Sequence, residues 1–246
     1  MKFTALASSS AGNAYVVSDG KTRLLIEAGL AHRTLQTLLG FQIGSLDGCL
    51  ISHEHKDHAK AALEVIKDGI PVYMSAGTKE ALNATGAAVC ASMEQFSIGS
   101  MEVVPFATFH DCAEPLGFLI QSREDGDKLV FATDTVNLRY KFPGVNILAI
   151  EANFDPEILS RCEKMPEKTK HRIANTHMDI HVLCEYLCSL DLSLCREIYL
   201  LHLSNATSHE GHFINKVRRI VPPNVAVTAA CRGEKRRETG WQSAGV

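Results

Sequence analysis

Four metal-binding side chains lie within six residues of one another in the segment Ile51-Ser52-His53-Glu54-His55-Lys56-Asp57-His58. In an extended segment, side chains two positions apart project on the same side, so His53 and His55 can hold one metal ion together. Asp57 and His58 lie where the chain turns into an expected helix, which directs them toward a neighbouring point. This segment constrains the fold most strongly, because the fold must bring further ligands to it.

Three later residues each end an apolar stretch of an expected β-strand: His110 follows Met101–Phe109, Asp134 follows Leu129–Thr133 and His202 follows Ile198–Leu201. Taken alone, each of them fits an ordinary core or surface position. Together they occupy the same kind of position, the carboxyl end of a strand, which is where ligands gather in layered α/β folds. The pattern therefore predicts that these three side chains complete a metal site.

Strand-forming segments alternate with segments of helical spacing in both halves of the 246-residue chain, and no linker rich in glycine, proline or serine divides it. The pattern predicts an α/β (α+β) fold in which two sheets are covered by helices, as four layers of one domain over residues 1–230. Residues 231–246 are expected to form a basic polar C-terminal tail. The expected strands are Lys2–Leu6, Ala14–Ser18, Arg23–Ile26, Gly48–Ile51, Val72–Met74, Met101–Phe109, Leu116–Ser122, Lys128–Thr133, Asn146–Ile150, Glu197–Leu203 and Val225–Thr228. The expected helices are Leu30–Leu39, Ala59–Ile66, Gly77–Ala84, Asp155–Cys162, Ile180–Leu190 and His209–Ile220.

Composition excludes several classes of protein. Hydrophobic residues make up 46% of the chain and charged residues 22%, unlike disordered, collagen-like or coiled-coil chains. A chain of this length folds without a disulfide or a structural metal, and its eight cysteines form no Cys-x-x-Cys pair, so we expect reduced thiols. The longest apolar runs are far shorter than the roughly 20 residues of a membrane helix, and the N-terminus has no recognisable signal segment. We therefore expect a soluble, cytoplasmic protein.

The ligand pattern resembles that of the metallo-β-lactamase fold hydrolases, a superfamily of αββα sandwiches. The resemblance extends from about Lys2 to Thr228 and is closest to the YycJ/WalJ-type branch, which is related to ribonucleases Z and J. The stretch His110-Asp111-Cys112-Ala113-Glu114-Pro115-Leu116-Gly117-Phe118 is much more specific to this branch than the superfamily motif is. The other supporting segments are Ala7–Asn13, Ala132–Thr135, Glu151–Asn153 and His202–Ser204.

The resemblance implies a site for two divalent metal ions, with ligands transferred by position. One ion is expected to be held by His53, His55 and His110, the other by Asp57, His58 and His202, with Asp134 bridging both. Zn²⁺ suits imidazole and carboxylate ligands best, and Mn²⁺ is the alternative. In such sites a hydroxide that bridges the ions is the nucleophile, and Asp57 is expected to act as a catalytic residue that orients it.

The chain departs from the resemblance at two positions. Superfamily members usually carry Asp in the segment before the first helix, where this chain has Glu27 in Leu25-Ile26-Glu27-Ala28-Gly29. Glu27 is therefore a candidate for supporting the metal ligands with a longer side chain. The branch often has His after Glu-x-Asn, where this chain has Phe154, so any contact made by that His is missing here.

The fold alone does not select a substrate, because the superfamily hydrolyses lactams, thioesters and phosphodiesters. The YycJ/WalJ branch is associated with exonuclease action on DNA. His177 lies in Asn175-Thr176-His177-Met178, upstream of an expected helix. It resembles the residue that assists the leaving oxygen in ribonuclease Z-like enzymes. We interpret His177 as catalytic, and the alternative is an ordinary histidine at a helix N-terminus.

Charge is distributed unevenly along the chain. The formal net charge is −3, but from Lys216 to the end seven Lys and Arg residues stand against two Glu. This basic end either follows a phosphate backbone beside the site or forms a solvated helix face and tail. The candidates for binding substrate are Ser10 and Asn13 in an early loop and Asn205, Ser208 and His209 after the last predicted ligand. Ser208 alternatively caps the following helix.

These observations lead to the hypothesis of a dinuclear metal-dependent phosphodiesterase, in particular a nuclease that trims DNA or RNA ends. Its substrate is then a nucleic acid or nucleotide phosphodiester, no membrane is involved, and a homodimer is one option for its assembly. The alternatives are a hydrolase of cyclic nucleotides or other small phosphodiesters, a thioesterase or lactamase, and a metal-binding protein without activity. A closed pocket around the metals favours a small substrate, whereas an open basic track favours a polynucleotide.

Overall fold

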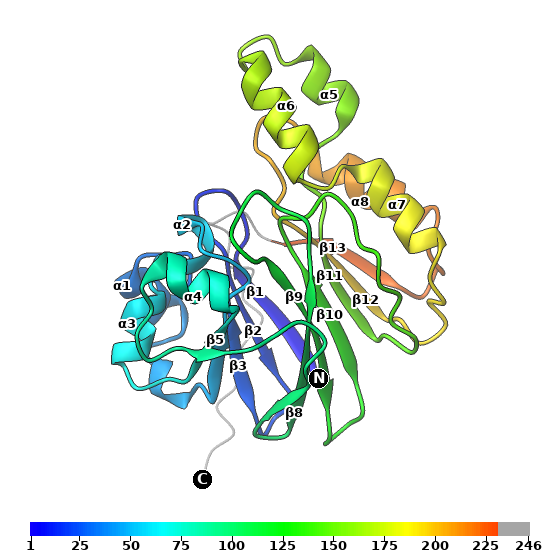
Figure 1. Ribbon diagram of the computed structural model, residues 1–246. Helices are drawn as coiled ribbons and strands as arrows, with labels where there is room; N and C mark the ends of the chain where they lie inside the picture. The colour runs from blue at the N-terminus through cyan, green and yellow to red at the C-terminus, as the bar shows by residue number, and fades with distance from the viewer. Residues whose placement is uncertain (231–246) are drawn as a thin grey trace.

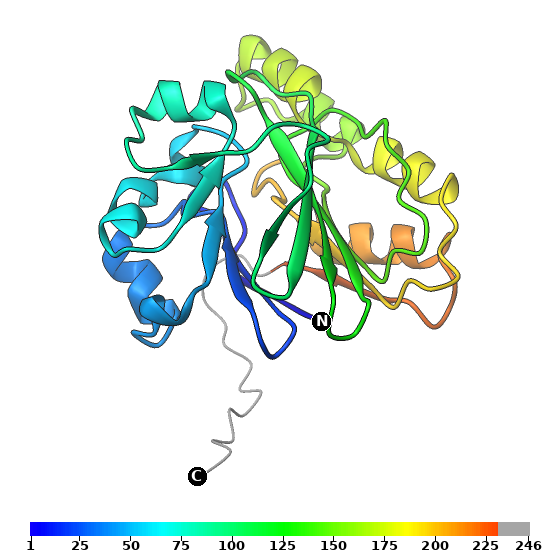
Figure 2. The ribbon, with the colours of Figure 1, turned by 60° about the horizontal axis from the view of Figure 1, so that its bottom comes forward.

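The computed structural model describes residues 1–230 as two β-sheets that pack face to face, with helices on both outer faces (Figure 1, Figure 2). This is the αββα arrangement that the sequence predicts. The expected tail, residues 231–246, lies outside the described residues, together with four of the seven basic side chains counted from Lys216 onward. None of the described helices has the length and apolar character that a membrane span requires.

The first sheet contains six strands in chain order. They are β1 (Lys2–Ala7), β2 (Ala14–Ser18), β3 (Arg23–Ile26), β4 (Gly48–Leu50), β5 (Val72–Met74) and β6 (Ala88–Val89). The first three strands pair antiparallel, whereas β3 to β6 are parallel. The carboxyl ends of β3 and β4 therefore share one edge, and Glu27 and the 53–58 segment follow these ends along the chain.

The second sheet contains seven strands in the order β13-β12-β11-β10-β9-β8-β7. They are β7 (Phe96–Ile98), β8 (Met101–Ala107), β9 (Leu116–Ser122), β10 (Lys128–Ala132), β11 (Ile147–Glu151), β12 (Glu197–Leu201) and β13 (Ala226–Ala229). β10 to β13 are parallel, and β8 runs in the same direction because β8 and β10 are both antiparallel to β9. The residues that follow β8, β10 and β12, including His110, Asp134 and His202, consequently lie at one edge of this sheet.

Helices cover the outer faces of both sheets. The first sheet is covered by α1 (His32–Leu38), a 3₁₀ turn (Ile43–Ser45), α2 (Lys56–Ala59), α3 (Ala62–Lys67) and α4 (Ala76–Leu82). The second sheet is covered by α7 (Ile180–Cys188) and α8 (Glu210–Arg218). The remaining helices, α5 (Pro156–Arg161) and α6 (Glu167–Thr176), project beyond the sandwich at the edge where these strands end (Figure 1). We call this pair the α5–α6 arm.

Alternate side chains of the central strands enter different hydrophobic cores. Leu129 and Phe131 of β10 pack between the two sheets, where Tyr15 of β2 meets them. Val130 and Ala132 point the other way and pack beneath α7 and α8. A third core lies between the first sheet and α1 to α4. Burial on both faces explains why the central strands read as continuous apolar runs, and the burial of this surface stabilises the four layers.

The structure differs from the sequence prediction in two helical regions. The helix predicted over Ala59–Ile66 is split into α2 and α3, because the backbone N–H of Ala61 donates to the carbonyl of Ala28 at 2.8 Å instead of continuing the first helix. Helix α6 is not among the predicted elements. Its only large apolar residue is Ile173, so its sequence has no series of apolar residues at helical spacing.

A close backbone approach at Gly29 fixes the position of α2. A Cβ atom at Gly29 would lie 1.7 Å from the carbonyl oxygen of Asp57, so only glycine fits there. The same carbonyl accepts a hydrogen bond from the backbone N–H of Asn13 at 2.8 Å, and the carbonyl of His58 accepts one from Ala28 N–H at 2.8 Å. These contacts hold the backbone of two predicted ligands against the first sheet.

Candidate metal centre

The seven predicted metal ligands lie together at the edge of the sandwich where the strands end. Their donor atoms fall into two groups, and within each group all the atoms lie within 4.8 Å of one another. One group contains His53, His55 and His110, and the other contains Asp57, His58, Asp134 and His202. The structure thus brings together every residue that the resemblance assigns as a ligand.

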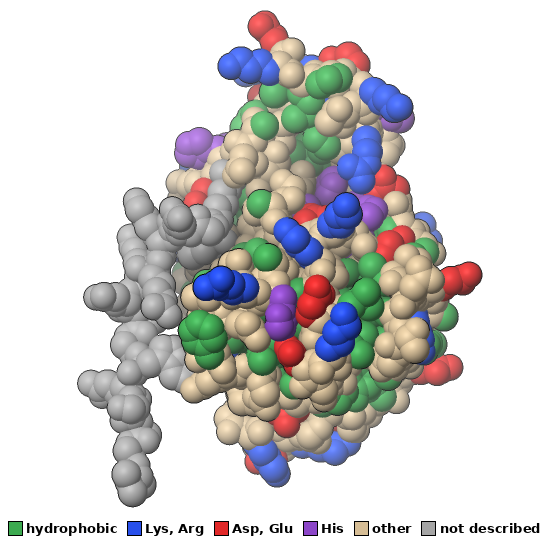
Figure 3. Space-filling model, turned by 90° about the vertical axis from the view of Figure 1, so that its left-hand side faces the viewer, with side chains coloured by type: hydrophobic (Ala, Val, Ile, Leu, Met, Phe, Trp, Pro, Cys, Tyr) green, Lys and Arg blue, Asp and Glu red, His purple; other side chains and the backbone are tan. Residues whose placement is uncertain are grey.

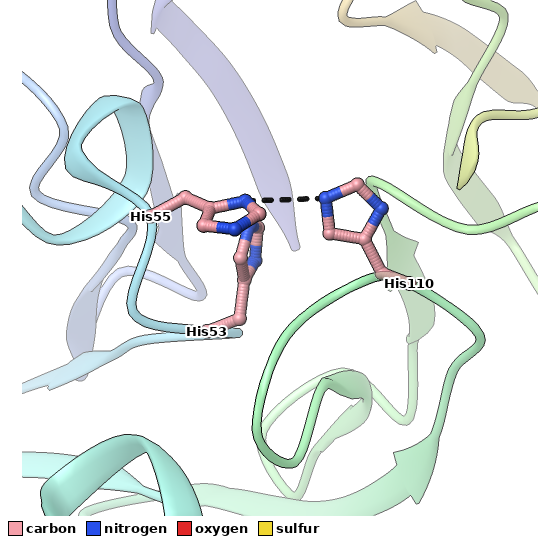
Figure 4. A group of neighbouring side chains, drawn as sticks. All are labelled: His53, His55 and His110. Atoms are coloured by element: carbon pink, nitrogen blue, oxygen red, sulfur yellow. Dashed lines mark hydrogen bonds between the residues drawn. The ribbon is translucent and has the colours of Figure 1, made fainter. Parts of the chain in front are cut away.

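The three imidazoles of the first group face a common point (Figure 4). The Nε2 atom of His110 lies 3.2 Å from Nδ1 of His55, and the ring of His53 lies against both. Ser52 Oγ lies 2.8 Å from His53 Nδ1, while His53 Nε2 is buried without a hydrogen-bond partner. Burial, together with the charge on His58, holds the pKa of His53 well below its usual value. His53 is therefore neutral, as a metal ligand has to be.

Asp134 lies between the two groups, with each carboxylate oxygen near one of them. Its Oδ2 lies 3.5 Å from His110 Nε2 and 4.0 Å from His53 Nε2. Its Oδ1 lies 3.0 Å from His202 Nδ1 and 3.4 Å from His58 Nε2. Burial alone would raise the pKa of Asp134, but the positive charges of His202 and His58 hold it well below its usual range. The carboxylate is therefore ionised and close to imidazoles of both groups.

Asp57 is the more exposed carboxylate of the second group. Its Oδ2 lies 3.4 Å from the Nε2 atoms of both His58 and His202. Although burial opposes ionisation, the neighbouring imidazoles of His202 and His58 keep the pKa of Asp57 below its usual value. The pKa values of His58 and His202 are raised well above normal, because the nearby carboxylates outweigh the effect of burial. The second group thus combines ionised carboxylates with imidazoles that they hold in place.

Three residues of the centre adopt backbone conformations that non-glycine residues rarely take. The φ angles of Glu27, Asp134 and His202 are 64°, 47° and 52°. Such a conformation costs about 1–3 kcal/mol and persists only where the surroundings enforce it. Here Glu27 N–H donates to Leu50 O at 2.9 Å, and His202 N–H donates to the buried Ser8 Oγ at 2.8 Å. Three strained positions beside the predicted ligands agree with a functional site here.

Glu27 supports the imidazole of His58. Glu27 lies beside Nδ1 of this ring, whereas Asp134 lies beside Nε2. Glu27 is fully buried, with Oε1 3.6 Å from His58 Nδ1, and Oε2 accepts a hydrogen bond from Ser52 N–H at 3.4 Å. Burial raises the pKa of Glu27 above its usual value. Phe154, the other departure, is also buried, and its carbonyl accepts from Ile180 N–H at 3.0 Å. Its ring offers no ligand atom.

Sequence reasoning missed Glu151, a buried carboxylate at the end of β11. Its Oε1 accepts hydrogen bonds from His177 Nδ1 at 2.7 Å and His202 Nδ1 at 3.2 Å. Its Oε2 accepts from the backbone N–H groups of Thr135 at 2.9 Å and Met178 at 3.0 Å. The available signal was a lone Glu closing an apolar strand, in the same position type as the predicted ligands. Glu151, His177, His202 and Asp134 form a third group of potential metal ligands.

His177 lies between α6 and α7, close to Asp134. Its Nδ1 is 3.9 Å from Asp134 Oδ2, and its ring is packed against those of His110 and His202. Burial would lower the pKa of His177, but the Glu151 carboxylate raises it above the usual value. An imidazole beside the metal-binding cluster is thus kept protonated and oriented by a buried carboxylate, which suits a proton donor.

Asparagine side chains hold two of the predicted ligands. Asn13, a predicted substrate contact, is buried, and its Nδ2 lies 3.1 Å from His58 Nε2 and donates to Asp57 O at 3.1 Å. Its Oδ1 accepts from Tyr15 Oη at 3.1 Å. Asn153 Nδ2 donates to His202 O at 2.9 Å. The structure therefore places Asn13 beneath the centre, where it positions α2.

The other predicted substrate contacts lie at the surface. Ser10 and Asn205 are exposed, and Ser208 is half-buried with Oγ donating to Ser204 O at 2.5 Å. His209 caps α8, since its Nδ1 accepts from His212 N–H at 3.2 Å, so the capping role considered for Ser208 belongs to His209. His209 also lines a cavity of about 590 Å³ between α5 and the start of α8. Substrate binding by these four residues stays a prediction.

Comparison with known proteins gives the family. The family model described as "Beta-lactamase superfamily domain" matches residues 22–202, a span that includes all seven predicted ligands. The chain belongs to the metallo-β-lactamase superfamily. Among solved structures, the metallo-β-lactamase fold protein YhfI from Bacillus subtilis superposes with a TM-score of 0.72 at 16% identity, over 93% of this chain and 95% of that one. That likeness shows the shared fold.

Two relatives are similar over most of their length. Exodeoxyribonuclease YycJ of Bacillus anthracis is 32% identical, covering 83% of this chain and 83% of that protein. Exodeoxyribonuclease WalJ of Streptococcus pneumoniae serotype 2 is 29% identical, covering 82% and 81%. The branch suggested by the sequence segments is confirmed, and this metallo-β-lactamase fold chain has the His/Asp cluster expected of a hydrolase.

Replacing Glu151 tests its structural importance. In the Glu151→Ala variant, the protonated His177 and two backbone N–H groups lose a buried acceptor, so we expect the free energy of unfolding to fall by about 3–5 kcal/mol. Urea denaturation in the presence of a chelator measures this loss without a contribution from bound metal. The control is Glu157→Ala, whose exposed ion pair with Arg161 is worth little. A loss below about 1 kcal/mol for Glu151→Ala would contradict the role assigned to this carboxylate.

Proposed function

We propose that this protein is a metal-dependent phosphodiesterase that removes nucleotides from DNA ends. The observation that carries the proposal is the position of Asp134 between two imidazole groups, with the His177–Glu151 pair directly beside it. Asp134 and the imidazole groups on either side of it supply a place for two cations, and the His177–Glu151 pair supplies a proton donor. The names of the two relatives, both exodeoxyribonucleases, support DNA as the substrate.

The residues of the centre fit divalent metal ions. His53 Nε2 in the first group and His202 Nε2 in the second are buried without hydrogen-bond partners. An unsatisfied buried polar atom costs about 1–3 kcal/mol, and a cation in each group would satisfy both nitrogens. A set of five imidazoles and two carboxylates suits Zn²⁺ and also accepts Mn²⁺. The centre is therefore well suited to two ions of this kind.

The assignment of ligands follows the two groups. His53, His55 and His110 would hold one ion, Asp57, His58 and His202 the other, and Asp134 would contact both. When bound, such a pair of ions activates water and neutralises charge on the phosphoryl oxygens. Asp57, the more exposed of the two ligand carboxylates, is placed to orient a water molecule entering the centre.

His177 is proposed to protonate the leaving oxygen. His177 Nδ1–H donates a hydrogen bond to Glu151 Oε1 at 2.7 Å. The proton on Nε2 is therefore the one that His177 gives to the substrate. Glu151 is itself fixed by the N–H groups of Thr135 and Met178, so the imidazole is held by a rigid acceptor. A DNA oxygen leaves poorly as an alkoxide, and a positioned proton donor lowers that barrier.

The position of the centre favours a large substrate over a small one. His55 and Asp57 are partly exposed at the edge of the sandwich. The cavities of about 590 and 520 Å³ lie at α5 and at α4, and the predicted ligands are not among their lining residues. A polymer end can reach ligand side chains that are exposed at such an edge.

Cleavage of labelled DNA tests the proposed function. The protein loaded with Zn²⁺ or Mn²⁺ should shorten end-labelled single- or double-stranded DNA progressively, and Asp134→Ala should lose at least 100-fold in rate, because neither metal group is complete without it. No cleavage, at an enzyme concentration that hydrolyses bis-p-nitrophenyl phosphate, would reject the nuclease and leave a phosphodiesterase of small molecules. Unchanged turnover by Asp134→Ala would show that the site is misassigned.

The role of His177 is tested by varying the leaving group. p-Nitrophenolate leaves without a proton, whereas the oxygen of a DNA ester needs one. His177→Ala should therefore slow DNA cleavage by about 10²–10⁴-fold and slow bis-p-nitrophenyl phosphate hydrolysis far less. The matched control is His181→Ala, an exposed histidine of α7 whose ring contacts Lys216. Equal losses on both substrates would argue that His177 only maintains the site.

A further inference from the structure

Two unpaired lysines border the metal-binding cluster on the side of the first sheet. Lys56 immediately precedes Asp57, and Lys60 follows His58 by two residues. Both lie in helical backbone four residues apart, so their side chains leave the same face of the chain. Both are exposed, and within residues 1–230 neither ammonium group has an ion pair or a side-chain hydrogen bond. Their charge is therefore available to a ligand.

A guanidinium borders the cluster on the side of the α5–α6 arm. Arg172 of α6 holds Asp111 through Nε at 2.7 Å and a second nitrogen at 3.1 Å, and its side chain is 54% exposed. Arginine has five N–H donors, so three remain free after this contact. Asp111 follows the predicted ligand His110 along the chain, and Asp111 Oδ1 is 3.3 Å from His110 Nε2. Asp111 therefore orients Arg172 at the entrance to the centre.

The base of the arm is fixed to the same ligand. The carbonyl of Thr176, the last residue of α6, accepts a hydrogen bond from His110 Nδ1 at 2.7 Å. Besides Asp111, the carboxylates of Asp134 and Asp57 contribute to raising the pKa of Arg172, which agrees with a position close to the centre. The arm is thus attached to the metal-binding cluster and holds Arg172 at a set place.

The surface shows basic side chains on two sides of the site. Figure 3 faces the side of α1 to α4 and shows Lys and Arg side chains both above and below a group of histidines beneath the arm. Between Pro156 and Thr176 the chain has five Lys or Arg residues and three Glu, against a net charge of −3 for the whole chain. Lys168 and His171 of α6 are exposed as well. The arm therefore carries a net positive charge in a chain whose net charge is negative.

We propose that a single strand of DNA is held between α2 and the α5–α6 arm, with its phosphates paired to Lys56 and Lys60 on one side and to Arg172 on the other. This inference rests on the proposed function. One phosphodiester carries one negative charge and occupies the metal centre itself, so cations on two opposite sides match the additional phosphates of a longer strand. The arrangement selects a polymer end over a mononucleotide ester.

Binding of DNA at several salt concentrations tests the inference. The probe is a fluorescent single-stranded 20-mer with phosphorothioate linkages that resist cleavage, bound to the metal-loaded protein. Each phosphate contact on a single strand contributes about 0.7 to the slope of log K against log salt. The double variant Lys56→Glu/Lys60→Glu should reduce the magnitude of this slope by about 1.4, and Arg172→Ala by about 0.7. The dissociation constant of the double variant should rise at least tenfold at low salt.

The matched control reverses the same number of charges at the opposite edge. Lys2 begins β1, and Lys21 lies in the turn just before β3. Both strands run toward the metal centre, so the two lysines lie at the opposite edge of the sheet. Lys2→Glu/Lys21→Glu should keep the wild-type slope. If the α2 variant and this control behave alike while the wild-type protein binds and cleaves DNA, the strand does not pass between α2 and the arm, and the nuclease proposal stands.

A second readout separates the two proposals further. Wild-type kcat/KM should rise with the length of a cleavable single strand from dinucleotide to 20-mer, and the Lys56→Glu/Lys60→Glu variant should lose most of that rise. A flat length dependence in the wild-type protein would overturn the strand path alone. Absence of both DNA binding and DNA cleavage in the wild-type protein would overturn the proposed function together with this inference.

Discussion

The carboxylate of Asp134 is the contact on which the rest of the site depends. Its two oxygens lie within 3.0–4.0 Å of nitrogens from four imidazoles, which come from three separate segments of the chain. An ionised carboxylate is stable at this depth because the positive charges of His202 and His58 lie beside it. The residue takes a left-handed backbone conformation two residues after β10. β10 is the central strand of the second sheet and is buried on both faces, so its packing helps to hold this strained conformation. The sandwich as a whole can thus be understood as the scaffold that holds this one side chain.

Much of the fold and most of the centre were predictable, because both follow from local sequence features. The alternation of apolar strands and helices determined the layers, and a ligand after each of three strands determined the edge where they meet. Glu151 was missed because Glu151–Asn153 was used only as a segment that supports the resemblance, and the function of this carboxylate appears only through its contact with His177. Helix α6 was missed because a solvated helix needs no apolar stripe. The contact of Asn13 with His58 was not predicted, because it depends on the approach of two loops that are distant in sequence, and substrate binding by Asn13 stays a prediction.

The projecting arm is the part of residues 1–230 that extends beyond the sandwich (Figure 1). Most of the other described helices and strands belong to the four layers. The α5–α6 arm is attached to the predicted ligand His110 through Thr176 and to its neighbour Asp111 through Arg172. A binding surface attached in this way places a substrate relative to the metals with little freedom. The superfamily fold accounts for the hydrolytic centre, and we propose that the arm and the lysines of α2 select a DNA strand.

The central claim is that two metal ions share Asp134. Crystals of the Zn²⁺-loaded protein, measured at the zinc absorption edge, test it most directly. The account predicts two anomalous peaks about 3.5–4 Å apart. One peak should lie among His53, His55 and His110, and the other among Asp57, His58 and His202, with Asp134 in contact with both. A single peak, or a second peak enclosed by Glu151, His177 and His202, would contradict the account, because the proton donor would then be a metal ligand.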